Sequence, residues 1–205
     1  MNVGNSVRKA IDDWEHGELD ASMLHACNAV DGTAKKLYPS LASNARFTRL
    51  LRENYGILGP MGVPGINLVA TRWPVKVERP KAAGGKPDTA DVLYGIHRCS
   101  HSHGDELPDG FTLLPDAAGP PRQTRMLIEK GKVQLSDRVI FGLLAVSVMS
   151  PVNIGQIVPD GYHFRFGLLK LPINEWWGRA ADFPIIVSQE TLPQVTLDFA
   201  DWMDT

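Results

Sequence analysis

Apolar residues near the start of the chain recur every three or four positions, a spacing that predicts amphipathic helices. The first stripe consists of Val7, Ile11 and Trp14, which lie at positions i, i+4 and i+7. Ser6 precedes this stripe and belongs to the residue types that cap helices, whereas Gly17 follows the stripe and can end a helix. The pattern therefore predicts a first helix between these two residues.

Two further helices are expected before residue 56, because the same spacing continues along the chain. The second helix has its apolar stripe at Leu24, Cys27, Ala34, Leu37 and Tyr38. Pro39 ends this helix, since proline has no backbone N–H and its ring clashes with the preceding turn. The third helix directs Phe47, Leu50 and Leu51 toward the core.

The middle of the chain changes character twice. Residues 56–88 are dominated by glycine, proline and short apolar fragments, which predicts an ordered loop without long helices. Asp88 and Gly104 then bracket about four turns of helix, as an N-cap and a C-terminal stop. The sequence RMLIEKGKVQLS predicts two short strands around a turn at Lys130 and Gly131.

The run VIFGLLAVSVM, residues 139–149, is apolar on nearly every side, as expected for a central helix or one shared with a partner chain. Its length is well below the roughly 20 residues that a bilayer span needs, so no membrane partner is expected. The tail alternates apolar and polar residues in YHFRFG and again in QVTLDF, which predicts short antiparallel strands.

The expected fold class is mainly α: a helical bundle with a small antiparallel β hairpin and C-terminal short strands. We expect a single domain over residues 1–205, since this length supports one core. The helical core is expected at about 5–150 and a β-rich appendage at about 155–205.

Composition and charge narrow the location and the partners. Hydrophobic residues make up 43% of the chain and charged residues 21%, which is typical of a globular protein rather than a disordered one. Two cysteines, and a start without the regions of a signal peptide, predict a cytoplasmic protein. The net charge of -2 argues against coating by nucleic acid over the whole surface but permits a local basic strip.

The densest chemistry lies in the seven positions His97 to His103, which hold an arginine, a cysteine and three histidines. Two i, i+4 pairs exist here, His97 with His101 and Cys99 with His103. Their directions around an ideal helix differ by about 160 to 200°, so one helix cannot place all four around a tetrahedral metal ion. No HExxH or CxxC spacing occurs elsewhere. We therefore expect no metal ion and no other cofactor.

Arg98, four intervening residues and His103 lie at the end of a predicted helix, in the stretch ADVLYGIHRCSHSHGDELPDG. This stretch resembles the Arg-x4-6-His signature of HEPN-domain proteins. The resemblance implies a helical bundle that forms a homodimer, and a metal-independent endoribonuclease of toxin or phage-defence type. In that reaction the ribose 2′-hydroxyl attacks the neighbouring phosphate. The implied partners are an RNA substrate, a second copy of the chain, and a cognate antitoxin or regulator.

The residue types suit these implied catalytic roles. His103 can exchange a proton near neutral pH, and Arg98 can bind two phosphate oxygens and stabilise the negative charge of the transition state. Asp105 and Glu106 follow His103 at a helix C-terminus, which favours the imidazolium form and a general-acid role.

Two alternatives concern the partners of Arg98. On an ideal helix Arg98 and His103 are about 140° and 7.5 Å apart, so a dimer must bring two copies of the helix to one cleft. In a monomer with a regular helix, His101 is only about 60° from Arg98 and is the better catalytic partner. Asp31, which lies on the apolar stripe of the second helix and needs a cationic partner, or Asn28 one turn earlier, is expected to orient Arg98.

Arg46, Arg49 and Arg52 line up along one side of the third helix, where they can contact RNA phosphates or form a solvated face balanced by Glu53.

A second interpretation of the whole chain is a catalytically inactive HEPN-like module that binds RNA or regulates a partner. In this interpretation His97 and His101 are solvated, Cys99 is in the core and Arg98 pairs with Asp91.

Overall fold

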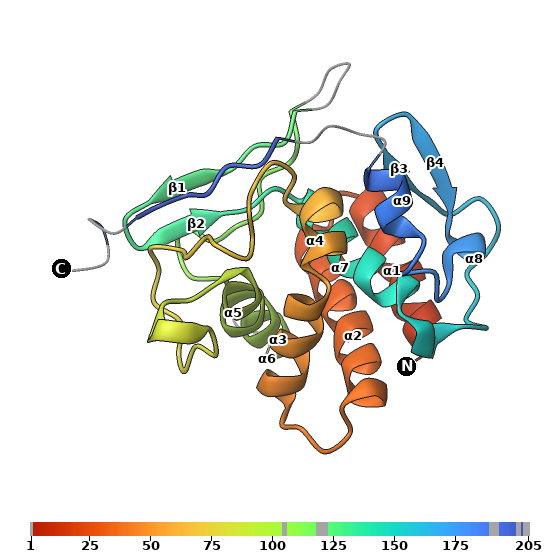
Figure 1. Cartoon of the computed structure of the whole chain (residues 1–205), viewed down its shortest axis with the longest axis horizontal. Coiled ribbons are helices and arrows are strands. Elements are labelled where there is room, and N and C mark those ends of the chain that lie inside the picture. Colours follow the sequence, from red (N-terminus) through yellow and green to blue (C-terminus); the bar gives the residue numbers. More distant parts are fainter. Residues whose placement is uncertain (1, 104–105, 118–122, 189–192, 200–201, 203–205) are drawn as a thin grey trace.

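The computed structural model describes residues 2–103, 106–117, 123–188, 193–199 and 202, without the side chains of Ser102 and His103. Its helices are α1 (Val3–Glu15), α2 (Leu19–Leu37), α3 (Ser43–Glu53), α4 (Tyr55–Gly62), η1 (Ala83–Gly85), α5 (Thr89–Val92), η2 (Leu93–Arg98), α6 (Cys99–His103), α7 (Arg138–Met149), η3 (Pro151–Asn153), α8 (Ile173–Trp176) and α9 (Phe183–Val187). Its strands are β1 (Leu127–Glu129), β2 (Lys132–Gln134), β3 (His163–Phe166) and β4 (Leu169–Pro172). The fold is mainly helical, as expected, with two antiparallel strand pairs on opposite sides of the helices (Figure 1).

The first helix begins earlier than its apolar stripe indicated. Asn2, rather than Ser6, caps α1: its side chain accepts a hydrogen bond from the Asn5 backbone N–H at 2.8 Å. Ser6 is buried one turn into the helix, where its hydroxyl donates to the Asn2 carbonyl at 3.3 Å. Both residue types are good caps, so the sequence alone did not separate them.

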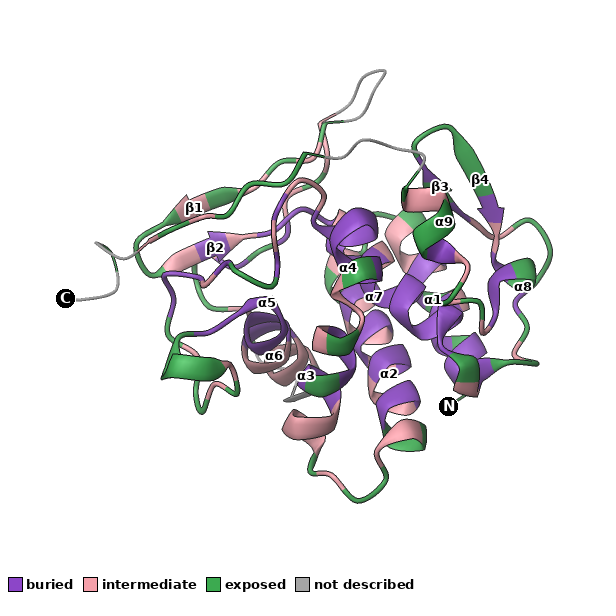
Figure 2. Ribbon diagram, in the orientation of Figure 1, coloured by how far each residue is buried: buried purple, intermediate pink, exposed green. Residues whose placement is uncertain are grey.

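The core is centred on α7, which packs against α2 and α4. The prediction of a buried helix here is confirmed, since every residue from Gly142 to Met149 is buried (Figure 2). α7 and α4 cross at two glycines. A Cβ atom built on Gly142 would lie 2.8 Å from the Gly62 Cα, closer than real Cβ contacts allow. The crossing therefore requires glycine, because any side chain would push the two helices apart.

α4 was missed by the sequence analysis, which assigned residues 56–88 to a loop. Pro60 lies inside this helix and cannot donate to the carbonyl four residues earlier, that of Gly56. Gly56 is exposed, so water can satisfy that carbonyl. All residues from Ile57 to Gly62 are buried. Packing against α7 thus stabilises a helix that local propensity disfavours.

The segment from Asp88 to His103 is helical, as predicted, but not uniformly α-helical. Asp88 caps it by accepting a hydrogen bond from the Asp91 N–H at 3.0 Å. α5 then passes into η2, which is a π-helix, before α-helical geometry resumes in α6. A π-turn has more residues per turn than an α-helix. Angular positions taken from an ideal α-helix therefore do not carry across η2.

The predicted hairpin is confirmed by the pairing of β1 with β2, in which Ile128 lies opposite Val133. In the tail, YHFRFG forms β3 as expected and pairs with β4. The prediction of a second tail strand in QVTLDF is wrong, because Val195 forms only an isolated bridge with Ile66. This bridge is the strand pairing found in the described segment 193–199, and it attaches the tail to the loop after α4.

None of the helices in the described part of the chain combines the length and the apolar character that crossing a bilayer requires.

Candidate functional site

Arg98 lies where α2 and the end of η2 pack together, and it forms an ion pair across this contact. Its Nε donates to Asp31 Oδ2 at 2.9 Å. The expected contact between Asp31 and Arg98 is present, and it is Asp31 rather than the half-buried Asn28 that holds the guanidinium. The alternative pairing with Asp91 is wrong, because Asp91 is bound by other groups described below.

The ion pair is only partly accessible to water. The side chains of Arg98 and Asp31 are 21% and 18% exposed. Burial lowers the pKa of Arg98, but the hydrogen bond to Asp31 and the charge of Asp31 together raise it by more than burial lowers it. The net shift is therefore upward. The Arg98 Cζ also lies 5.3 Å from the centre of the Tyr94 ring. A permanently charged guanidinium is thus held at a fixed place on the surface.

Arg98 forms its hydrogen bond with Asp31 through Nε, and no hydrogen bond from its two Nη groups to another described residue is found. Asp31 Oδ1 is buried and likewise has no hydrogen-bond partner among the described residues. A guanidinium with free Nη groups can bind an anion, and phosphate oxygens are a good match for its geometry. The arrangement is therefore suited to holding a phosphate group.

Both cysteines lie beside this ion pair. Cys27 is buried on α2, and burial followed by the charge of Asp31 raises the pKa of its thiol. Cys99 follows Arg98 directly and is half-buried. Because nucleophilic chemistry requires the thiolate, Cys27 is not a nucleophile in the folded protein.

His97 is fully buried, which the sequence analysis did not anticipate. Neither of its ring nitrogens has a hydrogen-bond partner among the described residues. Burial, and to a smaller extent the charge of His101, lowers the pKa of His97 to about 3. The interpretation that left His97 solvated is wrong, because the π-turn changes which residues of this helix face the core.

His101 is half-buried against His97, and the two ring centres are 6.1 Å apart with an interplanar angle of 26°. Burial lowers the pKa of His101, while the charge of Asp20 opposes the shift. Its Nε2 is buried without a hydrogen-bond partner in the described region. The structure thus places His101 beside His97 and shows no contact between it and Arg98.

The backbone of α6 extends to His103, but the His103 side chain lies outside the described residues, as do Gly104 and Asp105. The predicted pairing of His103 with Arg98 therefore stays a prediction. Within the described residues, no group of three or more histidine, cysteine, aspartate or glutamate side chains is arranged to hold a metal ion.

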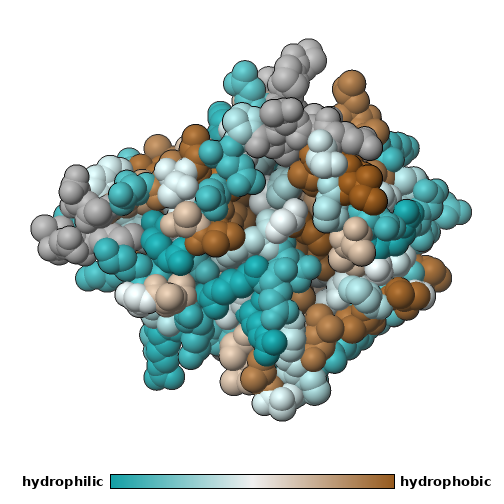
Figure 3. All heavy atoms as spheres, in the orientation of Figure 1, coloured by the Kyte–Doolittle hydropathy of each residue, from teal (hydrophilic) through white to brown (hydrophobic). Residues whose placement is uncertain are grey.

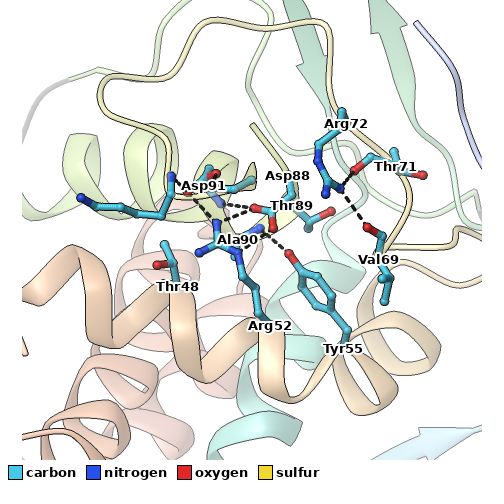
Figure 4. A network of polar contacts seen from close by, with 12 residues as sticks. Thr48, Arg52, Tyr55, Val69, Thr71, Arg72, Asp88, Thr89, Ala90 and Asp91 are labelled. Carbon is cyan, nitrogen blue, oxygen red and sulfur yellow. Dashed lines mark hydrogen bonds and ion pairs between the residues drawn. The ribbon is translucent and has the colours of Figure 1, made fainter. Parts of the chain in front are cut away.

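A second cluster of charges lies between α3 and the start of α5, centred on Arg52 (Figure 4). Arg52 binds both oxygens of Asp88, at 2.7 Å through Nε and 2.9 Å through Nη2. The same Nη2 lies 2.8 Å from Asp91 Oδ1. The Asp88 and Asp91 side chains are only 4% and 1% exposed, so the single positive charge of Arg52 is shared between two buried carboxylates.

The cluster also anchors the loop before α5. The Asp91 carboxylate accepts hydrogen bonds from the backbone N–H groups of Lys81 and Ala82, both at 2.9 Å. Burial raises the pKa of the Asp88 carboxyl, but hydrogen bonds from Arg52 and from the Asp91 N–H lower it by more than burial raises it. The net shift is therefore downward. All these groups satisfy one another, which is typical of a structural network.

The three arginines predicted to bind RNA are therefore not equivalent. Arg49 binds Glu53 at 2.7 Å and lies 4.6 Å from the Tyr38 ring centre. Arg46 donates to Ser43 Oγ at 3.2 Å. Arg52 is committed to two carboxylates, which leaves it little capacity for a phosphate.

The fold and the site define a mainly helical protein with a partly exposed Arg–Asp pair between two of its helices. The sequence profile of the Rv1289 family matches residues 2–203, and the chain belongs to that family.

Two mycobacterial relatives match nearly the whole chain. "Uncharacterized protein Rv1289" of Mycobacterium tuberculosis (strain ATCC 25618 / H37Rv) is 40% identical over 203 residues, which are 98% of this chain and 95% of the relative. "Uncharacterized protein Mb1320" of Mycobacterium bovis (strain ATCC BAA-935 / AF2122/97) shows the same identity and coverage. No solved structure matches the chain.

Proposed function

We propose that this protein is a HEPN-like endoribonuclease of toxin or phage-defence type that cleaves RNA without a metal ion. The observation that carries the proposal is the ion pair between Arg98 and Asp31, which joins the helix with the Arg-x4-His motif to α2. The motif alone is short, but an acidic partner was expected from the position of Asp31 on the apolar stripe of the second helix, and a fixed guanidinium at this place suits phosphate chemistry.

In the proposed reaction, the Nη groups of Arg98 bind the non-bridging oxygens of the scissile phosphate. The ribose 2′-oxygen attacks phosphorus and loses its proton to a base, the bond from phosphorus to the 5′-oxygen breaks, and that oxygen takes a proton from an acid. The products are a 2′,3′-cyclic phosphate and a 5′-hydroxyl. His103 supplies the acid. Buried His97, whose pKa is lowered to about 3, does not take this role near neutral pH.

The proposed active form is a cytoplasmic homodimer. Arg98 and His103 are five residues apart on one helix, and a second copy can supply the missing group to a shared cleft. His101 is the alternative acid, although it contacts His97 in the structure.

The test is cleavage of 5′-labelled single-stranded RNA with EDTA present. The variants are Arg98→Gln, His103→Ala and His101→Ala, and circular dichroism monitors folding. Arg179→Gln is the surface control, since Arg179 pairs with Asp182 and both side chains are about half exposed. Loss of an essential electrostatic or proton-transfer group costs about 100-fold or more, so we expect that loss in Arg98→Gln and His103→Ala. A single 2′-deoxy substitution must block cleavage at that position. Full activity in both variants, or a metal requirement, would refute the proposal.

A catalytically inactive RNA-binding or regulatory module is the second candidate. The position of His101 against His97, away from Arg98, favours it over catalysis by a single chain. Binding of RNA without cleavage, unchanged by the substitution of His103, would support this candidate.

A further inference from the structure

Residues 72–86 form a segment with a strong positive charge, here called the basic loop, which is buried at Trp73 and Val75 and mostly exposed from Lys76 onward. It contains five cationic residues and one acidic residue, whereas the whole chain has a net charge of -2. These residues are Arg72, Lys76, Glu78, Arg79, Lys81 and Lys86. Positive charge is thus concentrated in one part of a slightly acidic protein.

Four of the five cations of the basic loop are exposed, whereas Arg72 is half-buried and donates to the Val69 and Thr71 carbonyls at 2.9 Å. Lys76, Lys81 and Lys86 are exposed, and none of the three forms an ion pair with another described residue. Arg79 is 84% exposed, and its contact with the equally exposed Glu78, at 3.5 Å, is too solvated to neutralise it. Hydrophilic side chains cover this corner of the molecule, at the lower left of Figure 3. The surface is free to bind an anionic partner.

The backbone of the basic loop is fixed, although its side chains are exposed. Its Lys81 and Ala82 N–H groups bind the buried carboxylate of Asp91. Its Val77 packs on Gly95, where an added Cβ would come within 2.4 Å of Val77 Cγ1. Gly95 precedes Arg98 by three residues on the same helix. The loop is therefore attached to the helix that carries the candidate site.

One residue of the loop also has an unusual backbone. Arg79 adopts a φ of 54°, which places a non-glycine residue in the left-handed region. Such a conformation persists only where the surrounding structure enforces it. The contacts with Asp91 and Gly95 provide that constraint. The loop is therefore ordered before a ligand binds, and binding costs little conformational entropy of its backbone.

We infer that the basic loop binds the phosphate backbone of single-stranded RNA and so attaches it to the helix that carries Arg98. The inference rests on the proposed function for the identity of the polyanion. No large apolar side chain of residues 72–86 is exposed, whereas an amphipathic membrane-binding helix or the core of a protein interface needs such side chains. Arg52, which was predicted to bind RNA phosphates, is engaged by Asp88 and Asp91. The basic loop takes this phosphate-binding role in the inference.

The experiment measures binding of a fluorescent 20-nucleotide single-stranded 2′-O-methyl RNA by anisotropy. This probe has no free 2′-hydroxyl, so binding is observed whether or not the protein cleaves RNA. The full chain is compared with a Lys76→Gln/Lys81→Gln/Lys86→Gln variant. Three exposed lysines elsewhere are changed to glutamine in a control of equal charge, at Lys9, Lys35 and Lys170.

We expect the loop variant to bind at least tenfold more weakly at 0.1 M salt, and the control to bind as the wild type does. Each lost phosphate contact lowers the slope of log affinity against log salt by about 0.7, so the slope should fall by about 2. Equal weakening in both variants, no effect of the loop variant, or no RNA binding by the wild type would overturn the inference. Loop-dependent binding to polyglutamate or to phosphatidylserine vesicles, without RNA binding, would also overturn it. If binding of this probe depends on the loop but unmodified RNA is not cleaved in the assay of the proposed function, only the nuclease proposal is refuted.

Discussion

Replacing Arg52 with methionine tests whether this residue is structural. Arg52 makes three contacts of 2.7 to 2.9 Å with Asp88 and Asp91, whose side chains are almost fully buried. Methionine keeps much of the aliphatic volume but leaves two carboxylates facing each other without a cation. Removing one partner of a buried ion pair costs about 3–5 kcal/mol. At about 2–4 °C per kcal/mol for a chain of this size, the Tm should fall by about 6–20 °C.

The matched control is Arg49→Met on the same helix. Arg49 pairs with Glu53, and both side chains are about half exposed. Exposed pairs of this kind contribute little, so the Tm of the control should stay within about 2 °C of the wild type. Thermal unfolding followed by circular dichroism measures both variants.

The pH dependence gives a second readout. In the wild type the pKa of Asp88 is lowered, so its contribution to stability is present above the ordinary carboxyl pKa and is lost as the pH falls through the folded value. Without Arg52, burial raises the carboxyl pKa, and the stability deficit of the variant should shrink between pH 7 and pH 5. If Arg52→Met unfolds at the same temperature as Arg49→Met, the structural assignment fails.

Three further predictions concern other parts of the fold. A double-mutant cycle on Asp31→Ala and Arg98→Met, measured by urea unfolding, should give a coupling energy of about 1–2 kcal/mol, and a value below about 0.3 kcal/mol would contradict the ion pair. The lowered pKa of His97 means that the unfolded chain binds its proton first, so stability falls as the pH drops below 6.5. Between pH 7 and pH 5 the wild type should therefore lose about 2 kcal/mol more than His97→Phe in urea titrations, and equal losses would show that His97 is not buried. Gly142→Ala should cost about 1–3 kcal/mol in the same assay because the Cβ meets Gly62, and unchanged stability would mean that the helices do not cross there.

The parts of the fold that were predictable are those with a local signal. Asp88 caps its helix by contacting a residue three positions later, and α7 is apolar on every side because it is surrounded. By contrast, α4 contains Pro60 and three glycines, and it is helical because α7, about 80 residues further on, buries it. No window of sequence around Pro60 contains that information.

The candidate site divides in the same way. A carboxylate on an apolar stripe needs a cationic partner, and this requirement makes the pairing of Asp31 with Arg98 predictable from the sequence. The burial of His97 could not be predicted from the sequence, because it depends on a π-turn and ideal α-helical spacing contains no such turn. The assignment of Arg52 failed to foresee its two acidic partners, which come from a segment 36 to 39 residues later in the chain.

The π-turn in η2 holds one residue more than a regular α-helix would need between α5 and α6. Deleting one residue between Leu93 and Arg98 would allow a regular α-helix, in which each residue turns the chain by about 100° instead of by the smaller angle of a π-turn. The residues after the deletion would therefore keep nearly the same direction relative to α5, and Arg98 would still face Asp31. The residues inside the turn, His97 among them, would change direction, so the extra residue determines which side chains of the turn face the core.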